Sequence, residues 1–430
     1  MIPNVTAHRL AFIILAFSVL GLLNSFSLRE LAGGDWPQVL GPERNSRAIH
    51  EQPLARSWSG APPKQLWKIP VGSGYAGAAI ADGKAFLFDR IQEQERLVAV
   101  DLKTGQRLWQ AKWQAAYRSS MDPDSGPRAV PCISGDTVVC YGAAGDLVAI
   151  NTLDGAIRWQ RGLRKETRAE DGYFGAGCSP LVVDGTIVLN IGGKKAGVVG
   201  IDVKSGKTVW QTADYSASYA SPIAITVGSQ RAALVVTGLK TLLIEIETGK
   251  ILSEIDFGAR GPTVNAATPI SVGSNRFLLT ASYGVGAHLV EIDGKSFKRI
   301  WKNPVLASQY NSPVFFGGLV VGADGREDMG QAKLKGIDLA KPEAVWEKEL
   351  PGTTHLIAVG EDLLQLSIDG RLAISHLENR KMIDDGELQL PVVSSGRALY
   401  RALPALSNHI LVVRQTQDGT QGLFLAYELP

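Results

Sequence analysis

The feature that most constrains this chain is a short two-stranded motif that occurs again and again along it. Each copy consists of an apolar run, a turn and a second apolar run that ends in tryptophan. Close copies are LVAVDLKTGQRLWQ from Leu97, LVAINTLDGAIRWQ from Leu147, VVGIDVKSGKTVWQ from Val198 and LKGIDLAKPEAVWEK from Leu334. A supersecondary unit that recurs in this way predicts a repeat fold.

The spacing of the motif indicates which repeat fold. The tryptophans that end it are Trp67, Trp109, Trp159, Trp210, Trp301 and Trp346, and from Trp109 onward the steps are 50, 51, 91 and 45 residues. The step of 91 spans two repeats, because LLIEIETGKILSEI from Leu242 fits between them with Ser253 in the place of the tryptophan. Such a period is typical of β-propeller blades.

Each repeat divides into four strands, clearest in SPLVVDG, TIVLNIGG, GVVGIDVKSG and KTVWQ between Ser179 and Gln211. Glycine-containing turns separate the strands, and long helical periodicities are missing after the N-terminus, so we predict an all-β chain. First strands are expected to begin near Gly77, Ala129, Ser179, Ser221, Thr268, Ser312, His355 and Leu403. The prediction is an eight-bladed β-propeller with four-stranded antiparallel blades.

The two ends of the repeat region are complementary. The last unit stops at Pro430 after its third strand, whereas KQLWKIPVG, residues 64–72, is a fourth strand with nothing before it. We expect this N-terminal strand to complete the last blade and close the ring, which removes an exposed sheet edge. The repeated tryptophans are then expected to pack between neighbouring blades, the alternative being an exposed binding stripe.

Composition excludes some functions and leaves others open. The 430 residues carry 44 basic and 42 acidic side chains, a net charge of +2. Such a balance predicts no nucleic-acid partner and no polybasic membrane surface. Cys132, Cys140 and Cys178 are too few for a disulfide framework. Pairing Cys132 with Val139 across a tight turn points the first two cysteines to opposite sheet faces, so we expect free structural thiols.

The N-terminus differs from the rest of the chain. After His8 and Arg9, an apolar run of 14 residues extends from Leu10 to Leu23, interrupted by Ser18 and followed by Ser25-Phe26-Ser27. This length fits the core of a signal peptide better than a membrane span. We predict a signal peptide or uncleaved anchor over residues 1–27, an extended leader over 28–63 and the propeller over 64–430. The protein is expected to be exported to the periplasm or cell envelope, with residues 10–23 as its anchor if uncleaved.

The repeat pattern Ala/Gly-x-Asp-x-x-x-Gly-x-x-x-Trp resembles that of the pyrroloquinoline-quinone (PQQ) type β-propellers. It is formed by Ala99, Asp101, Gly105 and Trp109 in one copy and by Gly200, Asp202, Gly206 and Trp210 in another. The resemblance covers residues 64–430, and DWPQVLGPERNS, residues 35–46, resembles the leader of exported planctomycete-type proteins. The family includes BamB-type outer-membrane assembly scaffolds and quinoprotein dehydrogenases, so it predicts the fold more strongly than the function.

Resemblance to the quinoprotein dehydrogenases would imply a quinone stacked on tryptophan, a calcium ion held by Glu, Asn and Asp, and a disulfide between adjacent cysteines. This chain has no adjacent cysteine pair and lacks the long insertions of those enzymes. We therefore expect no cofactor and no metal site, and keep PQQ with calcium for an oxidoreductase alternative. The acidic stretch 323–331, with Asp324, Glu327 and Asp328, is predicted to be a solvated hairpin. GSGYAG, residues 72–77, precedes a hairpin rather than the helix that a dinucleotide site needs.

Corresponding loops of a propeller converge on one mouth of its channel, so residues that enter the first strands should become neighbours. Aromatic, amide and cationic groups around a concavity are typical of ligand sites. The candidates are Tyr75, Arg128, Tyr173, Phe174, Tyr219, Asn265, Tyr310, Asn311, His355 and Arg401. The alternative is that they are ordinary loop residues that bond the backbone. The longer loops 113–128 and 161–177 form a second candidate surface.

The sequence therefore predicts a non-catalytic binding or scaffolding propeller of the cell envelope. We expect a monomer whose partners are envelope proteins or peptides. The alternatives are a PQQ-dependent oxidoreductase and a carbohydrate- or peptide-binding propeller.

Overall fold

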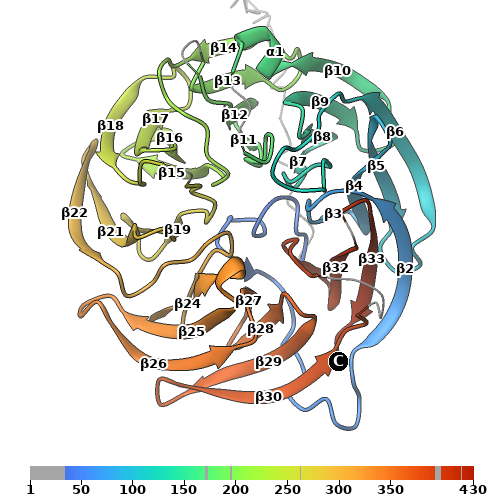
Figure 1. The fold of residues 1–430 in the computed structure, drawn as a ribbon, viewed down its shortest axis with the longest axis vertical. Helices are drawn as coiled ribbons and strands as arrows, with labels where there is room; N and C mark the ends of the chain where they lie inside the picture. Colours follow the sequence, from blue (N-terminus) through green and yellow to red (C-terminus); the bar gives the residue numbers. More distant parts are fainter. Residues whose placement is uncertain (1–33, 170–172, 194–195, 262, 393–398, 418) are drawn as a thin grey trace, which may run out of the picture. The chain divides into compact units, whose positions relative to one another are not determined.

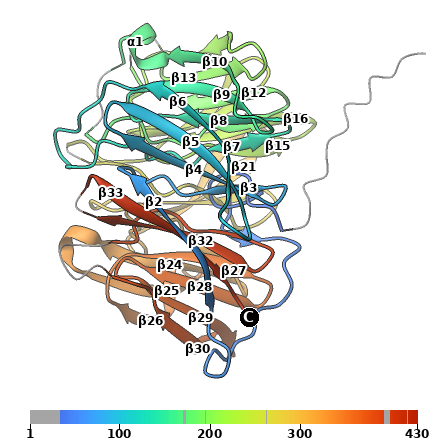
Figure 2. The same cartoon turned by 90° about the vertical axis from the view of Figure 1, so that its right-hand side faces the viewer.

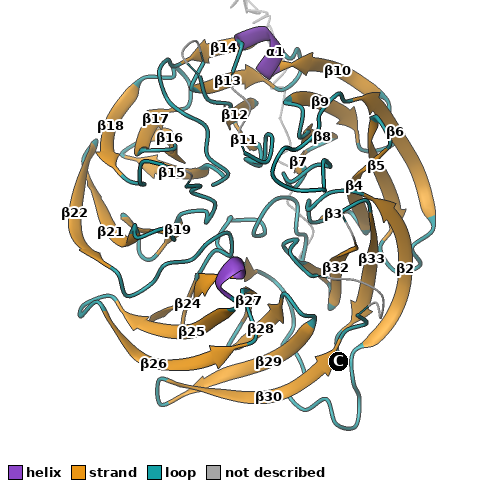
Figure 3. Cartoon of the chain, viewed as in Figure 1, coloured by secondary structure: helices purple, strands orange, loops and turns teal. Residues whose placement is uncertain are grey.

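The computed structural model describes residues 34–169, 173–193, 196–261, 263–392, 399–417 and 419–430. Within them, eight antiparallel sheets follow one another around a central channel (Figure 1). Each sheet is a four-stranded blade, and one blade gains a fifth strand. Strands dominate, and the described helices are one short α-helix and one 3₁₀ turn (Figure 3). The predicted eight-bladed, all-β propeller is confirmed.

The first four blades are continuous segments of the chain. Their strands run from the channel outward in sequence order. Blade 1 contains β3 (Ala79–Ala81), β4 (Lys84–Ile91), β5 (Gln94–Asp101) and β6 (Arg107–Gln114); blade 2 contains β7 (Cys132–Ser134), β8 (Thr137–Tyr141), β9 (Asp146–Asn151) and β10 (Ile157–Gly162), followed by α1 (Leu163–Thr167); blade 3 contains β11 (Leu181–Val183), β12 (Thr186–Asn190), β13 (Val198–Asp202) and β14 (Thr208–Gln211); blade 4 contains β15 (Ile223–Val227), β16 (Gln230–Val236), β17 (Lys240–Glu245) and β18 (Ile251–Asp256).

The last four blades include the two that recruit strands from the N-terminal region. Blade 5 contains β19 (Ile270–Ser271), β20 (Arg276–Ala281), β21 (Gly286–Asp293) and β22 (Ser296–Asn303); blade 6 contains β23 (Val314–Phe316), β24 (Leu319–Arg326), the 3₁₀ turn η1 (Glu327–Met329), β25 (Gln331–Asp338) and β26 (Glu343–Leu350); blade 7 contains β27 (Thr354–Val359), β28 (Asp362–Ser367), β29 (Arg371–Glu378) and β30 (Lys381–Gln389), with β1 (Arg47–Ala48) added; blade 8 contains β31 (Ala405–Ser407), β32 (Ile410–Gln417), β33 (Gln421–Glu428) and β2 (Lys64–Gly72).

The ring closes through the two ends of the propeller. Strand β2 pairs antiparallel with β33, in a register that runs from Lys64 opposite Glu428 to Gly72 opposite Gln421. The N-terminal strand thus supplies the fourth strand that the last blade lacks, as the sequence predicted. Pairing covers the edge of β33 that would otherwise be open to another chain.

The repeated tryptophan of one blade contacts the repeated glycine of the next. The Trp159 indole N–H donates to the Val203 carbonyl of blade 3 at 2.9 Å. Gly206 of blade 3 has a φ of +69°, and a Cβ on it would lie 2.7 Å from Trp159. Glycine is needed here both for the left-handed conformation and for the close approach of the ring.

The same indole hydrogen bond recurs around the outer part of the ring. The donors are Trp67, Trp109, Trp210 and Trp301, and their acceptors are the carbonyls of Leu102, Thr152, Ile246 and Leu339. In blade 4, where Ser253 replaces tryptophan, the Ser253 hydroxyl accepts the N–H of Phe297. The indole N–H of Trp346 has no partner among the described residues.

The segment before β2 crosses the channel in Figure 1 and runs along one face of the ring in Figure 2, and it bonds to most of the blades. Trp36 exchanges two backbone hydrogen bonds with Ile80 of blade 1, and Arg44 reaches the carbonyls of Pro180 and Pro222 in blades 3 and 4. Further bonds join this segment to blades 2, 6, 7 and 8; they involve Pro37 with Ile133, Arg47 with Phe315, β1 with β27, and Glu51 with Asn408. Residues 36–51 therefore fasten seven blades from inside the ring.

The three cysteines are buried and free, and Cys132 pairs with Val139 in the predicted register. Among the described residues, no helix is long and apolar enough to cross a membrane. The predicted signal peptide or anchor, residues 1–27, lies outside the described residues.

Candidate functional site

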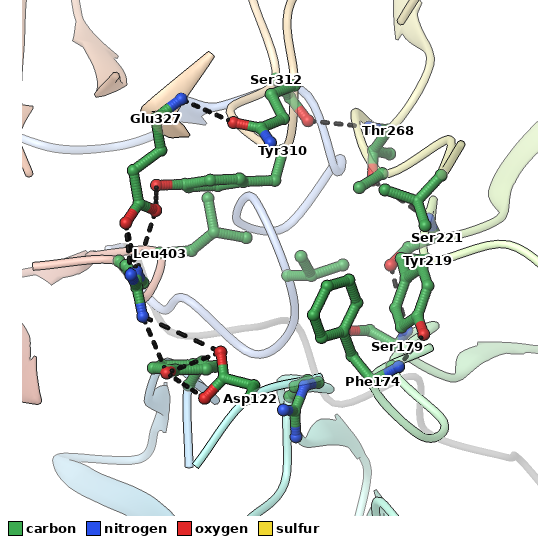
Figure 4. Close-up of a pocket in the computed structure, with 18 of the residues that line it drawn as sticks. Asp122, Phe174, Ser179, Tyr219, Ser221, Thr268, Tyr310, Ser312, Glu327 and Leu403 are labelled. Atoms are coloured by element: carbon green, nitrogen blue, oxygen red, sulfur yellow. Dashed lines mark hydrogen bonds and ion pairs between the residues drawn. The ribbon is translucent and has the colours of Figure 1, made fainter. Parts of the chain in front are cut away.

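A cavity of about 720 Å³ lies at one mouth of the central channel (Figure 4). Its walls come from loops that enter the first strands and from the turn η1, so distant parts of the sequence meet there. Val39 of the N-terminal segment, Val130 and Leu403 supply apolar surface. The volume falls in the range of small-molecule and peptide side-chain pockets.

One wall of the cavity is a charged network that spans blades 1, 6 and 8. The Arg401 guanidinium donates to both carboxylate oxygens of Glu327 and, at 2.8 Å, to the Tyr75 hydroxyl. Tyr75 in turn donates to the Asp122 carboxylate at 2.9 Å. The Tyr310 hydroxyl lies 3.0 Å from Glu327. These bonds hold the wall in one geometry across the seam where the ring closes.

Burial shifts the acid–base properties of this network. Burial raises the pKa of the Tyr310 and Tyr75 hydroxyls above their usual range, so both act as neutral donors and acceptors. Burial, the largest single influence, lowers the pKa of Arg401, but the hydrogen bond to Glu327 and the electrostatic attraction of Tyr75, Glu327 and Tyr310 together raise it. Arg401 therefore remains charged at every physiological pH.

The opposite wall is aromatic. The rings of Phe174 and Tyr219 are 6.1 Å apart in an edge-to-face arrangement, and the Tyr219 hydroxyl accepts the backbone N–H of Phe174. The Arg128 guanidinium lies 5.3 Å from the Tyr75 ring and 6.0 Å from that of Phe174. It donates to the carbonyls of Gly126 and Asp124, and no carboxylate pairs with it among the described residues. This wall presents a cation between two rings.

The floor is a chain of hydroxyls that passes from blade to blade. Val130 N–H donates to the Ser179 hydroxyl at 2.9 Å, and Ser179 N–H donates to that of Ser221 at 3.0 Å. The chain continues from Ser221 to Thr268 at 3.2 Å and from Thr268 to Ser312 at 2.8 Å. All four hydroxyl residues line the cavity although each is at least 95% buried. Each oxygen thus accepts a bond from the neighbouring blade.

The structure brings together six of the ten residues that the sequence nominates for the mouth. Those that line the cavity are Tyr75, Arg128, Phe174, Tyr219, Tyr310 and Arg401. Tyr173 is 42% exposed and outside the lining, as are the buried Asn265, Asn311 and His355. Asn265 and Asn311 bond backbone carbonyls, and His355 bonds the Arg401 carbonyl. These last three lie behind the wall and support it, and burial lowers the pKa of His355 to about 4.

The two long loops join this same cavity. Loop 113–128 supplies Asp122 and Arg128, and loop 161–177 supplies Phe174. From the sequence we predicted these loops to form a separate surface. Whether they extend over the channel mouth depends on how the blades are arranged, which the sequence alone does not show.

The acidic stretch of blade 6 is the predicted hairpin, formed by β24, η1 and β25 with an exposed tip at residues 328–331. Unexpectedly, Glu327 is bonded by Arg401 in the cavity wall, and Asp324 pairs with Lys335. The candidates nominated from the sequence did not include six residues that line the cavity, namely Asp122, Glu327 and the four floor residues Ser179, Ser221, Thr268 and Ser312. A signal for the floor exists in the sequence, since Ser/Thr-Pro opens the first strand of four successive blades, at residues 179, 221, 268 and 312.

The cavity lining does not fit PQQ with calcium. It contains no tryptophan to stack on a quinone. Its carboxylates Asp122, Glu327 and Asp328 are bonded to Tyr75, Arg401 and Arg326, so they do not form an oxygen cage. Among the described residues, no group of three His, Cys, Asp or Glu side chains is placed to hold a metal ion.

Fold and cavity define the class as an eight-bladed β-propeller with a ligand-sized hollow at its channel mouth. The chain belongs to the family described as outer membrane protein assembly factor BamB, whose profile matches residues 51–226 and 93–348. No curated protein matches the sequence significantly.

Solved structures share the fold at low identity. BamB from Moraxella catarrhalis is 16% identical, with a TM-score of 0.60 over 86% of this chain and 98% of that one. A europium-containing methanol dehydrogenase is 9% identical, with a TM-score of 0.69 over 93% of this chain and 98% of that one. At these identities the likeness concerns the fold alone.

Proposed function

We propose that this chain is a non-catalytic binding protein of the bacterial cell envelope that holds a segment of a protein partner in the channel-mouth cavity. The observation that carries the proposal is the cavity itself, in which a fixed charged wall faces an aromatic one. Both walls suit a polypeptide, because rings pack against apolar side chains while the network offers donors and acceptors to a backbone. Membership of the outer membrane protein assembly family supports a protein partner.

Exposed side chains at the rim of the cavity support a role in recognition, and the N-terminal sequence supports the location. Met329 of η1, 68% exposed, lines the cavity rim, and Met121 and Tyr173, each next to a lining residue, are 63% and 42% exposed. Methionine is flexible and polarisable and adapts to different partner surfaces. The predicted signal peptide and the leader-like residues 35–46 support placement in the envelope, and a monomer remains our expectation.

Site-specific photo-crosslinking in the envelope of the native host tests this proposal. A photoreactive residue at position 329 should give a discrete partner adduct, whereas one at Leu153, 68% exposed on the far hairpin of blade 2, should not. Phe174→Ala, which removes an aromatic wall but no backbone bond, should abolish the adduct at 329. An adduct that survives this substitution would place the partner outside the cavity.

The oxidoreductase alternative makes a different prediction. Calorimetric titration with PQQ and calcium should give no calcium-dependent heat, because the lining has no oxygen cage for the metal. Saturable, calcium-dependent binding would overturn the proposal and justify an assay of alcohol oxidation.

A further inference from the structure

The floor of the cavity combines two features that neither wall explains. The first is the set of four hydroxyls of Ser179, Ser221, Thr268 and Ser312. Each oxygen accepts a backbone N–H, but no acceptor for any of the four hydroxyl protons lies among the described residues. A hydroxyl carries one donor as well as its acceptor sites. The floor therefore offers four O–H donors to whatever enters the cavity.

The second feature is a buried cation that bonds the backbone next to two of these hydroxyls, those of Ser179 and Ser221. Arg44 is 2% exposed, and its guanidinium donates to the carbonyls of Pro180 and Pro222. These two prolines follow Ser179 and Ser221, so the same dipeptides carry both the cavity-lining hydroxyls and the carbonyls that Arg44 bonds.

The charge of Arg44 is not compensated by an acid. Its other partners are the Ser179 carbonyl at 3.5 Å, the Gln38 side-chain oxygen at 2.7 Å and the Cys132 sulfur, and no carboxylate pairs with it among the described residues. Burying an unpaired charge is costly, and carbonyl dipoles offset part of that cost. An anion above the floor would meet both the four donors and this field.

We propose that the floor of the cavity binds the carboxylate of an otherwise apolar or aromatic ligand. One guanidinium matches one negative charge, a carboxylate can accept from neighbouring hydroxyls of the row, and the aromatic rings of Phe174 and Tyr219 offer a surface for an apolar body. Arg128, at the side, adds a second cation on the approach. The inference rests on the proposed function, because it names the group by which the partner segment is held.

Such a carboxylate has two sources, the C-terminus of a polypeptide or a small organic acid. Two matched pairs separate them by calorimetry: 4-phenylbutyrate with 4-phenylbutanamide, and an N-acetylated Gly-Gly-Phe peptide with a free or an amidated C-terminus. We expect the acid to bind at least tenfold more tightly than the amide. Preference in the peptide pair assigns a chain terminus, and preference confined to phenylbutyrate assigns a small acid. Equal binding of acid and amide in both pairs, or no binding, overturns the proposal.

Floor variants identify the groups responsible. Thr268→Val should remove most of the preference for acid over amide, while Thr268→Ser, which keeps the hydroxyl, should retain it. Arg44→Met should remove the preference and Arg44→Lys retain part of it. Ser407→Ala is the matched control, because Ser407 is equally buried but lies outside the cavity.

The outcomes distinguish this inference from the proposed function. Crosslinks at position 329 that persist in Thr268→Val, together with equal binding of acid and amide by the unmodified protein, would overturn the carboxylate site and leave the partner-binding cavity standing. If the protein without floor substitutions gives no partner adduct at position 329, the proposed function itself is overturned.

Discussion

The outer rim of the propeller and its channel mouth are two ends of the same repeated blade, yet they differ in how closely successive copies match. At the rim, indole and glycine meet in almost the same way from blade to blade, as Trp159 meets Gly206. At the mouth, the position two residues before the first-strand start carries Tyr75 before blade 1, Gly177 before blade 3 and Arg401 before blade 8. The same residues therefore recur where neighbouring blades pack, and different residues occur where the loops converge. We expect the rim to determine stability and the mouth to determine binding.

The largest expected effect comes from removing the ring closure. A chain that begins at Ser73 lacks β2, and therefore exposes the whole edge of β33 and leaves blade 8 incomplete. We expect loss of cooperative thermal unfolding and association of the chains, measured by calorimetry and size-exclusion chromatography.

Two longer chains serve as controls for the chain that begins at Ser73. One that begins at Gly34 keeps every described strand and should unfold like the full protein. One that begins at Lys64 keeps β2 but loses the segment that bonds seven blades, and should lie between the other two. A monomeric chain from Ser73 with unchanged unfolding would show that closure does not depend on β2.

The next effect concerns the rim. Gly206→Ala places a Cβ 2.7 Å from Trp159 at a φ of +69°. Backbone strain and overpacking together should lower the free energy of unfolding by about 3 kcal/mol. Gly185→Ala is the control, because its φ is +79° but no atom lies within 4 Å, and it should cost about 1 kcal/mol. Similar losses for the two in urea unfolding would contradict the indole contact.

On the mouth side, stability should depend on pH through Glu95. This side chain is fully buried between blades 1 and 2, where it accepts the Ala143 N–H at 2.8 Å and the Trp113 indole N–H at 3.1 Å. Burial raises its pKa to about 7, above the 4.5 of an exposed glutamate. The native state therefore keeps a proton that the unfolded state releases, and stability falls as pH rises from about 4.5 to 7.

Between pH 5 and pH 8 this group should remove about 2.5 kcal/mol of unfolding free energy. Glu95→Gln should abolish that part of the pH dependence, measured by urea unfolding at both pH values. Gly206→Ala, at the rim, should keep it. An unchanged slope in Glu95→Gln would show that other groups cause the dependence.

The smallest effect compares two copies of the rim tryptophan. Trp301→Phe loses the indole bond to the Leu339 carbonyl, so it should cost about 1 kcal/mol more than Trp346→Phe. The Trp346 N–H has no partner among the described residues, and its removal leaves no acceptor unpaired. Thermal unfolding of both variants measures the difference, and equal costs would mean that ring packing alone matters at the rim.

The fold was predictable because its determinants are local. Hairpins such as residues 198–211 carry their own turns and strands, and the unpaired strand at residues 64–72 implied the closure. The aromatic half of the site was also accessible, because first-strand entrances such as those at Tyr75 and Tyr219 must converge in any propeller.

The rest of the site depends on geometry that no local pattern encodes. Asp122 and Glu327 meet around Arg401 across three blades, so their loops had to be placed before the network could be recognised. Arg44 lies in an irregular segment outside the repeat, and its insertion into the channel follows from backbone bonds such as that of Trp36 to Ile80.

The segment that carries Val39 and Arg44 across the channel has a consequence for how a partner can arrive. Val39 lines the cavity and Arg44 is buried beside it, so we expect this segment to hinder a polypeptide from threading through the ring. Under the proposed function, we then expect a partner to present an end or a tight bend to the open mouth and to leave by the same side. Release then needs no motion of the ring, so the lifetime of the complex is set by contacts at the mouth and floor.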